Sequence, residues 1–173
     1  MKIREAQMED FNELKAFYAR MNEVINLRNN NLNPDNPVYP TDEIVRNAIA
    51  EKEQFVGMED DKIVAGCIVN NECQEAYTHV KWKVDAGKEE FWVLHGLRIA
   101  PEYEGRGFAR QLLSFIFDRA KEHGKKAIRL DILEDYSVQN MYYRLGFQHI
   151  DTAELLYADI GYPKRFKLLE KEI

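Results

Sequence analysis

The chain has 173 residues, of which 45% are apolar, and this suits one globular domain over residues 1–173 with a single substantial core. Its formal net charge of -6 argues against a protein that coats nucleic acid, because such binding depends on neutralising many phosphates. No apolar run approaches the roughly 20 residues of a membrane span, so we expect no membrane association. The first residues lack the apolar core of a signal peptide, which favours a cytoplasmic location.

Apolar periodicity in the first half predicts helices and a β-hairpin. Asparagine and proline, which favour turns, fill the segment between the two expected helices. The expected elements are a strand at residues 2–5, a helix over 11–25, a loop over 29–37, a helix capped by Thr41, and hairpin strands at 55–58 and 63–69.

The second half predicts a central strand followed by a long amphipathic helix. Residues 91–99 are too apolar for an edge strand, and Pro101 follows them directly. The remaining expected elements are a helix from Gly107 to Gly124, a strand at 128–132, a short helix over 137–145 stopped by Gly146, and two terminal strands, from 147 onward and at 165–169.

Two stretches alternate apolar and polar residues. Within residues 70–89, Trp82 lies between lysines, and we expect a strand plus a loop there. Within residues 128–132, Arg129 and Asp131 alternate with isoleucine and leucine, as in a strand with one face toward solvent. The element order indicates a mixed α/β fold without internal repeats.

The two cysteines carry no expected chemistry. Cys67 and Cys73 have neither the spacing of metal ligands nor the density of a disulfide framework. We therefore expect reduced thiols and no metal site.

A glycine-rich loop joins the central strand to the long helix. Gly105 and Gly107 permit backbone angles that turn successive N–H groups inward, and the helix start adds unpaired donors and its dipole. Arg106 and Arg110 add cations that suit a phosphate. An ordinary strand-to-helix turn has the same glycines, so these residues alone leave both interpretations open.

The two commoner nucleotide-binding loops fit poorly. A Walker loop needs lysine and then Ser or Thr after its last glycine, but Phe108 and Ala109 follow Gly107. The dinucleotide fingerprint needs a small residue where Arg110 stands, and the loop follows a hairpin instead of a first βαβ unit. A nicotinamide or nucleotide enzyme therefore remains a weak alternative.

Two motifs resemble those of the GNAT superfamily of N-acetyltransferases. The run LRIAPEYEGRGFARQLL at residues 97–113 is similar to motif A, and MYYRLGF at residues 141–147 is similar to motif B. The chain departs from the family pattern at Glu104, where Arg or Gln is usual, and at Asp135, where Asn is usual. The resemblance covers essentially the whole chain and implies a central, mixed, mostly antiparallel sheet with splayed middle strands and flanking helices.

The resemblance also implies acetyl-CoA as co-substrate, with no metal. The strand at residues 97–99 would pair its backbone with the pantetheine arm, and the glycine loop would hold the pyrophosphate. The implied cofactor-binding residues are Leu97, Arg98, Ile99, Glu104, Gly105, Arg106, Gly107, Phe108, Ala109, Arg110 and Asp135.

Two side chains are candidates for proton transfer. Tyr142 matches the family position that protonates the CoA sulfur, although a packing aromatic would show the same spacing. His95 resembles the histidine base of arylalkylamine N-acetyltransferases, and alternation places it on one face with Leu97 and Ile99. A core histidine remains the alternative, and the rival bases are Glu89, Glu90, Asp135 and a water chain.

The sequence thus predicts an N-acetyltransferase that moves an acetyl group from acetyl-CoA to a primary amine by direct attack on the thioester. The alternative is a non-catalytic acyl-CoA sensor or interaction module on the same fold. The acceptor is a small-molecule or peptide amine, not nucleic acid or a membrane, and a homodimer is left open. By analogy with the family, the acceptor site would involve the segments 29–40, 81–83 and 157–162.

Overall fold

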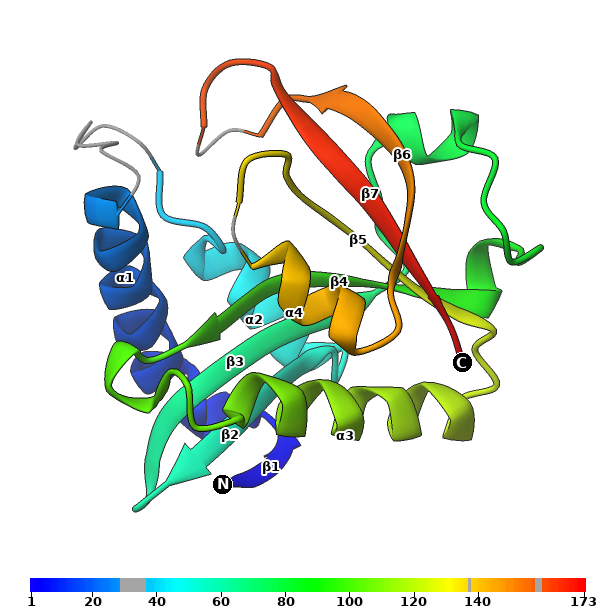
Figure 1. Ribbon diagram of the computed structural model, residues 1–173. Helices are drawn as coiled ribbons and strands as arrows, with labels where there is room; N and C mark the ends of the chain where they lie inside the picture. Colours follow the sequence, from blue (N-terminus) through cyan, green and yellow to red (C-terminus); the bar gives the residue numbers. More distant parts are fainter. Residues whose placement is uncertain (29–36, 137, 158–159) are drawn as a thin grey trace. The chain divides into compact units, whose positions relative to one another are not determined.

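The computed structural model describes residues 1–28, 37–136, 138–157 and 160–173. The loop expected over residues 29–37 lies outside the described residues except for residue 37. Ser137, the expected start of the short helix, also lies outside them. Figure 1 follows the chain from the N-terminus in blue to the C-terminus in red.

The described residues form a mixed α/β fold with a seven-stranded, mostly antiparallel sheet and flanking helices, as the sequence predicts. The strand order is β1-β2-β3-β4-β5-β7-β6, and β4 with β5 is a parallel pair. The strands are β1 (Lys2–Glu5), β2 (Gln54–Glu59), β3 (Lys62–Asn70), β4 (Phe91–Ile99), β5 (Ala127–Leu133), β6 (Gln148–Leu155) and β7 (Lys164–Glu172).

The helices agree with the expected order. The α-helices are α1 (Phe11–Arg28), α2 (Asp42–Ala50), α3 (Phe108–Glu122) and α4 (Gln139–Arg144), and the short 3₁₀ segments are η1 (Met8–Asp10), η2 (Glu75–His79), η3 (Lys88–Glu90) and η4 (Pro101–Tyr103). In the described ranges, none of the helices is both long enough and apolar enough to span a bilayer.

The chain divides into two compact units. Unit 1 comprises Met1–Val69 and His95–Phe115, and unit 2 comprises Asn70–Leu94 and Ile116–Ile173. Two of the boundaries fall inside continuous elements, β4 and α3. A single domain over residues 1–173 remains a prediction.

Unit 1 is built on the β2–β3 hairpin. Its turn residues Asp60 and Asp61 have φ of 49° and 57°, which matches the right-handed twist of a two-residue hairpin. One face of α1, including Leu14 and Tyr18, is buried in the same core as Val56 of β2. Thr41 caps α2 as predicted, because its hydroxyl accepts a hydrogen bond from the Ile44 N–H at 3.3 Å.

Unit 2 is built on β5, which pairs with β4 on one side and β7 on the other. The β4–β5 register runs from Phe91 opposite Ala127 to Val93 opposite Arg129. β7 lies between β5 and β6 and is antiparallel to both, as Figure 1 shows for the last, red strand. The predicted strand pair at the C-terminus is therefore confirmed.

The strand expected within residues 70–89 is wrong. The described segment contains η2 and η3 and no strand between β3 and β4. The Trp82 indole N–H donates to the Tyr77 carbonyl at 2.9 Å, and the backbone N–H groups of Lys83 and Val84 donate to Glu170. Because the Glu170 carboxylate accepts hydrogen bonds from these backbone N–H groups, the segment around Trp82 does not need a neighbouring strand.

The solvent-facing side expected for β5 is also wrong. Arg129 is only 3% exposed, and its Nε donates to the equally buried Glu170 of β7 at 3.1 Å. Its guanidinium also lies over the rings of Phe91 and Trp82, at 4.0 and 4.3 Å from their centroids. Arg129 on β5 is therefore buried with a partner instead of facing solvent, and Asp131, two positions later, is half-buried.

Candidate functional site

The glycine loop forms a turn between η4 and α3 in unit 1. Gly105 and Gly107 have φ of +72° and +79°, in the left-handed region that side chains with a Cβ avoid. A Cβ built on either glycine would meet no atom within 4 Å. Glycine is therefore required by the backbone conformation, and the loop borders open space instead of packed side chains.

The backbone donors of this loop are not used by the described part of the protein. The first hydrogen bond of the helix runs from the Gln111 N–H to the Gly107 carbonyl at 3.0 Å. Within the described ranges, the N–H groups of residues 105–110 donate to no protein acceptor. Because these donors lie at the positive end of the 15-residue helix α3, they form a site suited to an anion.

Arg106 is held at the loop by aromatic rings. Its guanidinium carbon lies 5.0 Å from the Tyr103 centroid and 5.2 Å from the Phe108 centroid, and these two rings stack on each other. Among the described residues, neither Arg106 nor the exposed Arg110 forms an ion pair with a carboxylate. Both cations can therefore meet a phosphate without giving up a protein partner.

Glu104 is paired with a residue that the motif does not contain. Arg28, at the end of α1, donates two hydrogen bonds to the Glu104 carboxylate, at 2.8 and 3.1 Å. A second bidentate pair joins Arg20 of α1 to Glu102 of η4, at 2.9 and 2.7 Å. The negative charge that departs from the family pattern is thus compensated by a cation from α1.

The end of β4 does not alternate as the sequence predicts. Gly96 has φ of +57°, outside the extended region, so the alternation from His95 to Leu97 is interrupted there. Strand alternation therefore does not place His95 on the same face as Leu97 and Ile99. His95 is half-buried, and Ile99 packs against the core of unit 1. The buried Nε of Arg98 has no partner in the described residues. Nη1 of the same guanidinium donates to the Leu97 carbonyl.

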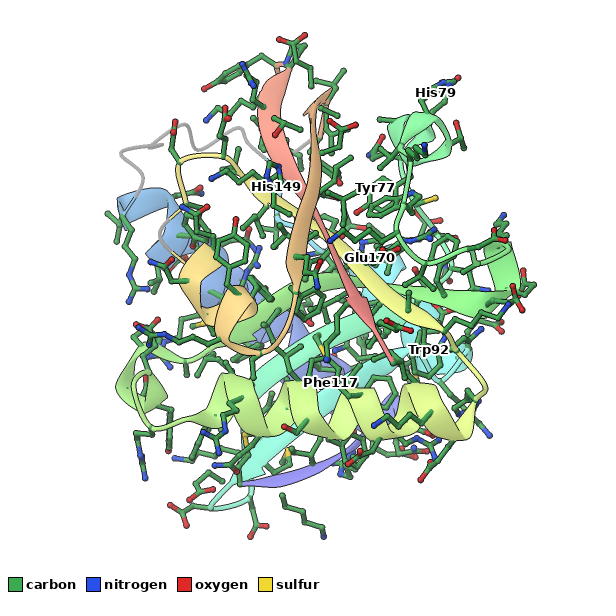
Figure 2. All side chains as sticks on the ribbon, turned by 45° about the vertical axis from the view of Figure 1, so that its right-hand side comes forward. Tyr77, His79, Trp92, Phe117, His149 and Glu170 are labelled. Atoms are coloured by element: carbon green, nitrogen blue, oxygen red, sulfur yellow. The ribbon has the colours of Figure 1, made fainter. Side chains whose placement is uncertain are left out.

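Tyr142 lies in α4 of unit 2. Its ring is only 6% exposed and packs edge-on against Phe147, with the centroids 5.5 Å apart. Phe147 in turn contacts Phe117 of α3, whose side chain is labelled in Figure 2. Asp135 lies exposed in the turn between β5 and α4. The ring of Tyr142 therefore packs in the core of unit 2, and a catalytic role for this residue depends on its hydroxyl.

Residues 18–147 match the acetyltransferase (GNAT) family. The chain belongs to the GNAT family. The match includes both motifs, the glycine loop and α4, so this GNAT chain is an acyltransferase, and its family uses acetyl-CoA as co-substrate.

The individual relatives are distant. A ribosomal protein bS18-alanine N-acetyltransferase from Haemophilus influenzae is 31% identical over 64 residues, which span 37% of this chain and 44% of that relative. A GNAT acetyltransferase from Streptococcus agalactiae shares the fold, with a TM-score of 0.79 and 20% identity over 99% of this chain and 95% of its own. N-acetylglutamate synthase from Neisseria gonorrhoeae, solved with coenzyme A and N-acetyl-glutamate, has a TM-score of 0.67 and 16% identity over 99% of this chain and 34% of its own.

Sequence reasoning missed two groups of residues. Arg28 stands 76 residues from Glu104, so no local pattern connects them. Asp131 of β5 accepts hydrogen bonds from the hydroxyls of Tyr77 and Tyr157, 54 and 26 residues away. The available signal was a charged residue at alternate positions of an apolar strand, which indicates burial with a partner when both faces are covered.

The ion pair at the loop predicts opposite effects for its two members. Glu104→Gln should lower the Kd for acetyl-CoA by about two- to five-fold at low salt, since exposed charges are worth up to about 1 kcal/mol. Arg28→Gln should raise the Kd, because Glu104 would keep its charge without this partner beside the phosphates. Isothermal titration at low salt and near 0.15 M, where the Debye length is ~8 Å, measures both effects and their screening.

The double variant, with glutamine at both positions, is the matched control and should bind acetyl-CoA close to wild type. If both single changes leave the low-salt Kd unaltered, the pair lies away from the bound phosphates.

Proposed function

We propose that this chain transfers an acetyl group from acetyl-CoA to a primary amine by direct attack of the amine on the thioester. The observation that carries the proposal is the row of unpaired backbone N–H groups at residues 105–110, opening onto free space at the start of α3. These residues lie within the segment that matches the family. A diphosphate with several acceptor oxygens fits such a row of donors.

The chain's own residues then divide the work. The amides of the glycine loop and the Arg106 guanidinium would hold the pyrophosphate, and the end of β4 would offer backbone groups to the pantetheine arm. Acetyl-CoA supplies the activated acetyl group and the thiolate leaving group. The Tyr142 hydroxyl would donate a proton to that thiolate, and a base would accept the proton of the amine.

His95 is the proposed base. An imidazole titrates near neutral pH and can accept a proton directly or through water. His95 is half-buried, which leaves it accessible to solvent. Among the rivals, Glu90 is engaged by the Lys126 ammonium at 2.6 Å, which holds the pKa of Glu90 below its usual value and makes it a weaker base.

The second candidate function is a non-catalytic acyl-CoA sensor. Its support in the sequence was the pair of departures at Glu104 and Asp135. The Arg28 contact compensates the first of these charges, which favours the enzyme. The acceptor class stays broad, and the Haemophilus relative suggests a peptide N-terminus as one member of it.

Acetyl-CoA should raise the melting temperature of the protein, because a ligand bound only by the folded state stabilises it. Gly107→Glu should abolish this shift, since it places bulk and negative charge where the backbone meets phosphate and also disfavours a φ of +79°. Differential scanning fluorimetry with acetyl-CoA, NAD and ATP measures the effect. Stabilisation by NAD or ATP and not by acetyl-CoA would contradict the proposed co-substrate, and binding without turnover across an amine panel would support the sensor.

Tyr142→Phe should lower turnover by about 10²–10⁴-fold, the range usual for general acid catalysis. The substitution keeps the ring that packs on Phe147 and removes only the hydroxyl. The melting shift with acetyl-CoA should therefore remain, which separates chemistry from binding. Turnover equal to wild type, measured as free CoA released with the best acceptor, reduces Tyr142 to a packing residue.

A histidine base should leave an acidic limb in the pH profile of kcat/KM, near the ordinary imidazole pKa of about 6.5. His95→Gln should remove this limb and lower kcat/KM without changing the acetyl-CoA melting shift. Because ionisation of the amine can imitate the limb, two acceptors of different pKa are compared. A limb that follows the acceptor and survives in His95→Gln assigns the base to a carboxylate or a water chain.

A further inference from the structure

A carboxylate in unit 2 accepts hydrogen bonds from two phenols and forms no ion pair with any described residue. Oδ2 of Asp131 accepts from the Tyr77 hydroxyl at 2.9 Å and from the Tyr157 hydroxyl at 2.8 Å. Tyr77 belongs to η2, and Figure 2 shows its side chain directed toward the strands, whereas His79 of the same segment points outward. The two phenols join η2 and the segment that follows β6 to the middle of β5.

The surroundings of Asp131 are aromatic and apolar. The Tyr77 ring lies 5.2 Å from that of Trp82, and the Tyr157 ring lies 5.2 Å from that of Phe166. Burial raises the pKa of the Asp131 carboxyl, and the two phenol hydrogen bonds act in the opposite direction. An anion in such surroundings is costly unless a positive charge compensates it.

No cation among the described residues pairs with this carboxylate. Across the described ranges, Asp131 takes part in no ion pair, and its Oδ1 has no hydrogen-bond partner. Arg129, two positions earlier on the same strand, is engaged by Glu170. Asp131 is nevertheless half-buried and not sealed off, so part of the residue remains accessible.

We propose that Asp131, with the rings of Tyr77 and Tyr157, binds an organic ammonium group of the acceptor. A carboxylate oxygen with a free lone pair and neighbouring aromatic rings together match an ammonium, which combines hydrogen-bond donors with a charge that ring faces attract. In the described part of the chain, no group of three or more His, Cys, Asp or Glu residues could hold a metal ion, so the site does not resemble a metal centre.

The bound group is one that does not react. A carboxylate beside an ammonium raises the pKa of the amine and opposes the proton loss that attack on a thioester requires. Asp131 therefore suits a second cationic group on the acceptor, and the inferred substrate class is a diamine or another amine that carries a separate ammonium. The inferred substrate class rests on the proposed acetyl transfer. The binding of an ammonium group at Asp131 does not depend on that proposal.

The binding test uses Trp82, which packs against Tyr77 of the site. The chain has two tryptophans, so Trp92→Phe leaves Trp82 as the reporter, 5.2 Å from Tyr77. Titration with 1,4-diaminobutane and n-butylamine near pH 7, without acetyl-CoA, should change the Trp82 emission saturably, whereas 1-pentanol, a neutral molecule of similar size, should not. Adding Asp131→Asn, whose carbonyl can still accept from the phenols, should weaken amine binding at least about tenfold.

The activity test compares kcat/KM for 1,3-diaminopropane, 1,4-diaminobutane and 1,6-diaminohexane with that for n-butylamine. Wild type should prefer at least one diamine, and Asp131→Asn should lose this preference while keeping its melting shift with acetyl-CoA. Asp118→Asn, an exposed carboxylate on α3, gives the same change in net charge and should behave as wild type.

The outcomes separate the two proposals. Saturable, Asp131-dependent binding without turnover of any amine supports the ammonium site and contradicts acetyl transfer to these acceptors. Turnover with no diamine preference and no change in Trp82 emission overturns the ammonium site. Equal losses of kcat/KM for the diamines and for n-butylamine in Asp131→Asn, accompanied by a lower melting temperature without ligand, overturn it as well, because Asp131 would then be a structural acceptor for the two phenols.

Discussion

The buried pair of Arg129 and Glu170 holds unit 2 together. Arg129 donates to Glu170 across the β5–β7 pairing and to the Val84 carbonyl, and the second oxygen of Glu170 accepts from the backbone of Lys83 and Val84. Burying two charges is costly, and removing one partner of such a pair typically costs roughly 3–5 kcal/mol. The segment after η2 therefore has a fixed path, and Trp82 is held between Arg129 and Tyr77.

Polar groups that have hydrogen-bond partners within the protein belong to the scaffold, whereas polar groups without such partners among the described residues are candidates for binding a ligand. Both carboxylate oxygens of Glu170 accept hydrogen bonds, one from Arg129 and the other from the backbone N–H groups of Lys83 and Val84. This buried carboxylate is therefore part of the scaffold. The amides of residues 105–110 and Oδ1 of Asp131 are the opposite case among the described residues, since they keep hydrogen-bonding capacity unused in a partly accessible position. The first set suits an anion, and the second suits a cation.

The loop shows how a departure from a motif can be absorbed by the fold. Glu104 introduces a negative charge where the family has a positive or neutral residue, and α1 brings Arg28 to it. The pair restores neutrality locally while leaving the backbone donors and Arg106 in place. The motif is therefore better described by its glycines and free amides than by its first side chain.

Local signals determined much of this protein. Thr41 as a helix cap, the aspartates of the hairpin turn, and Gly105 and Gly107 before α3 act through neighbours a few residues away, so the sequence alone predicts them. Pairs made across the chain are different: Arg28 with Glu104, Arg129 with Glu170, and Tyr77 with Asp131 are 76, 41 and 54 residues apart. Their charges look solvent-exposed in the sequence because periodicity reports only one strand or helix at a time. Only the packing of other elements onto β5 and the glycine loop decided which charges are compensated and which remain available to a ligand.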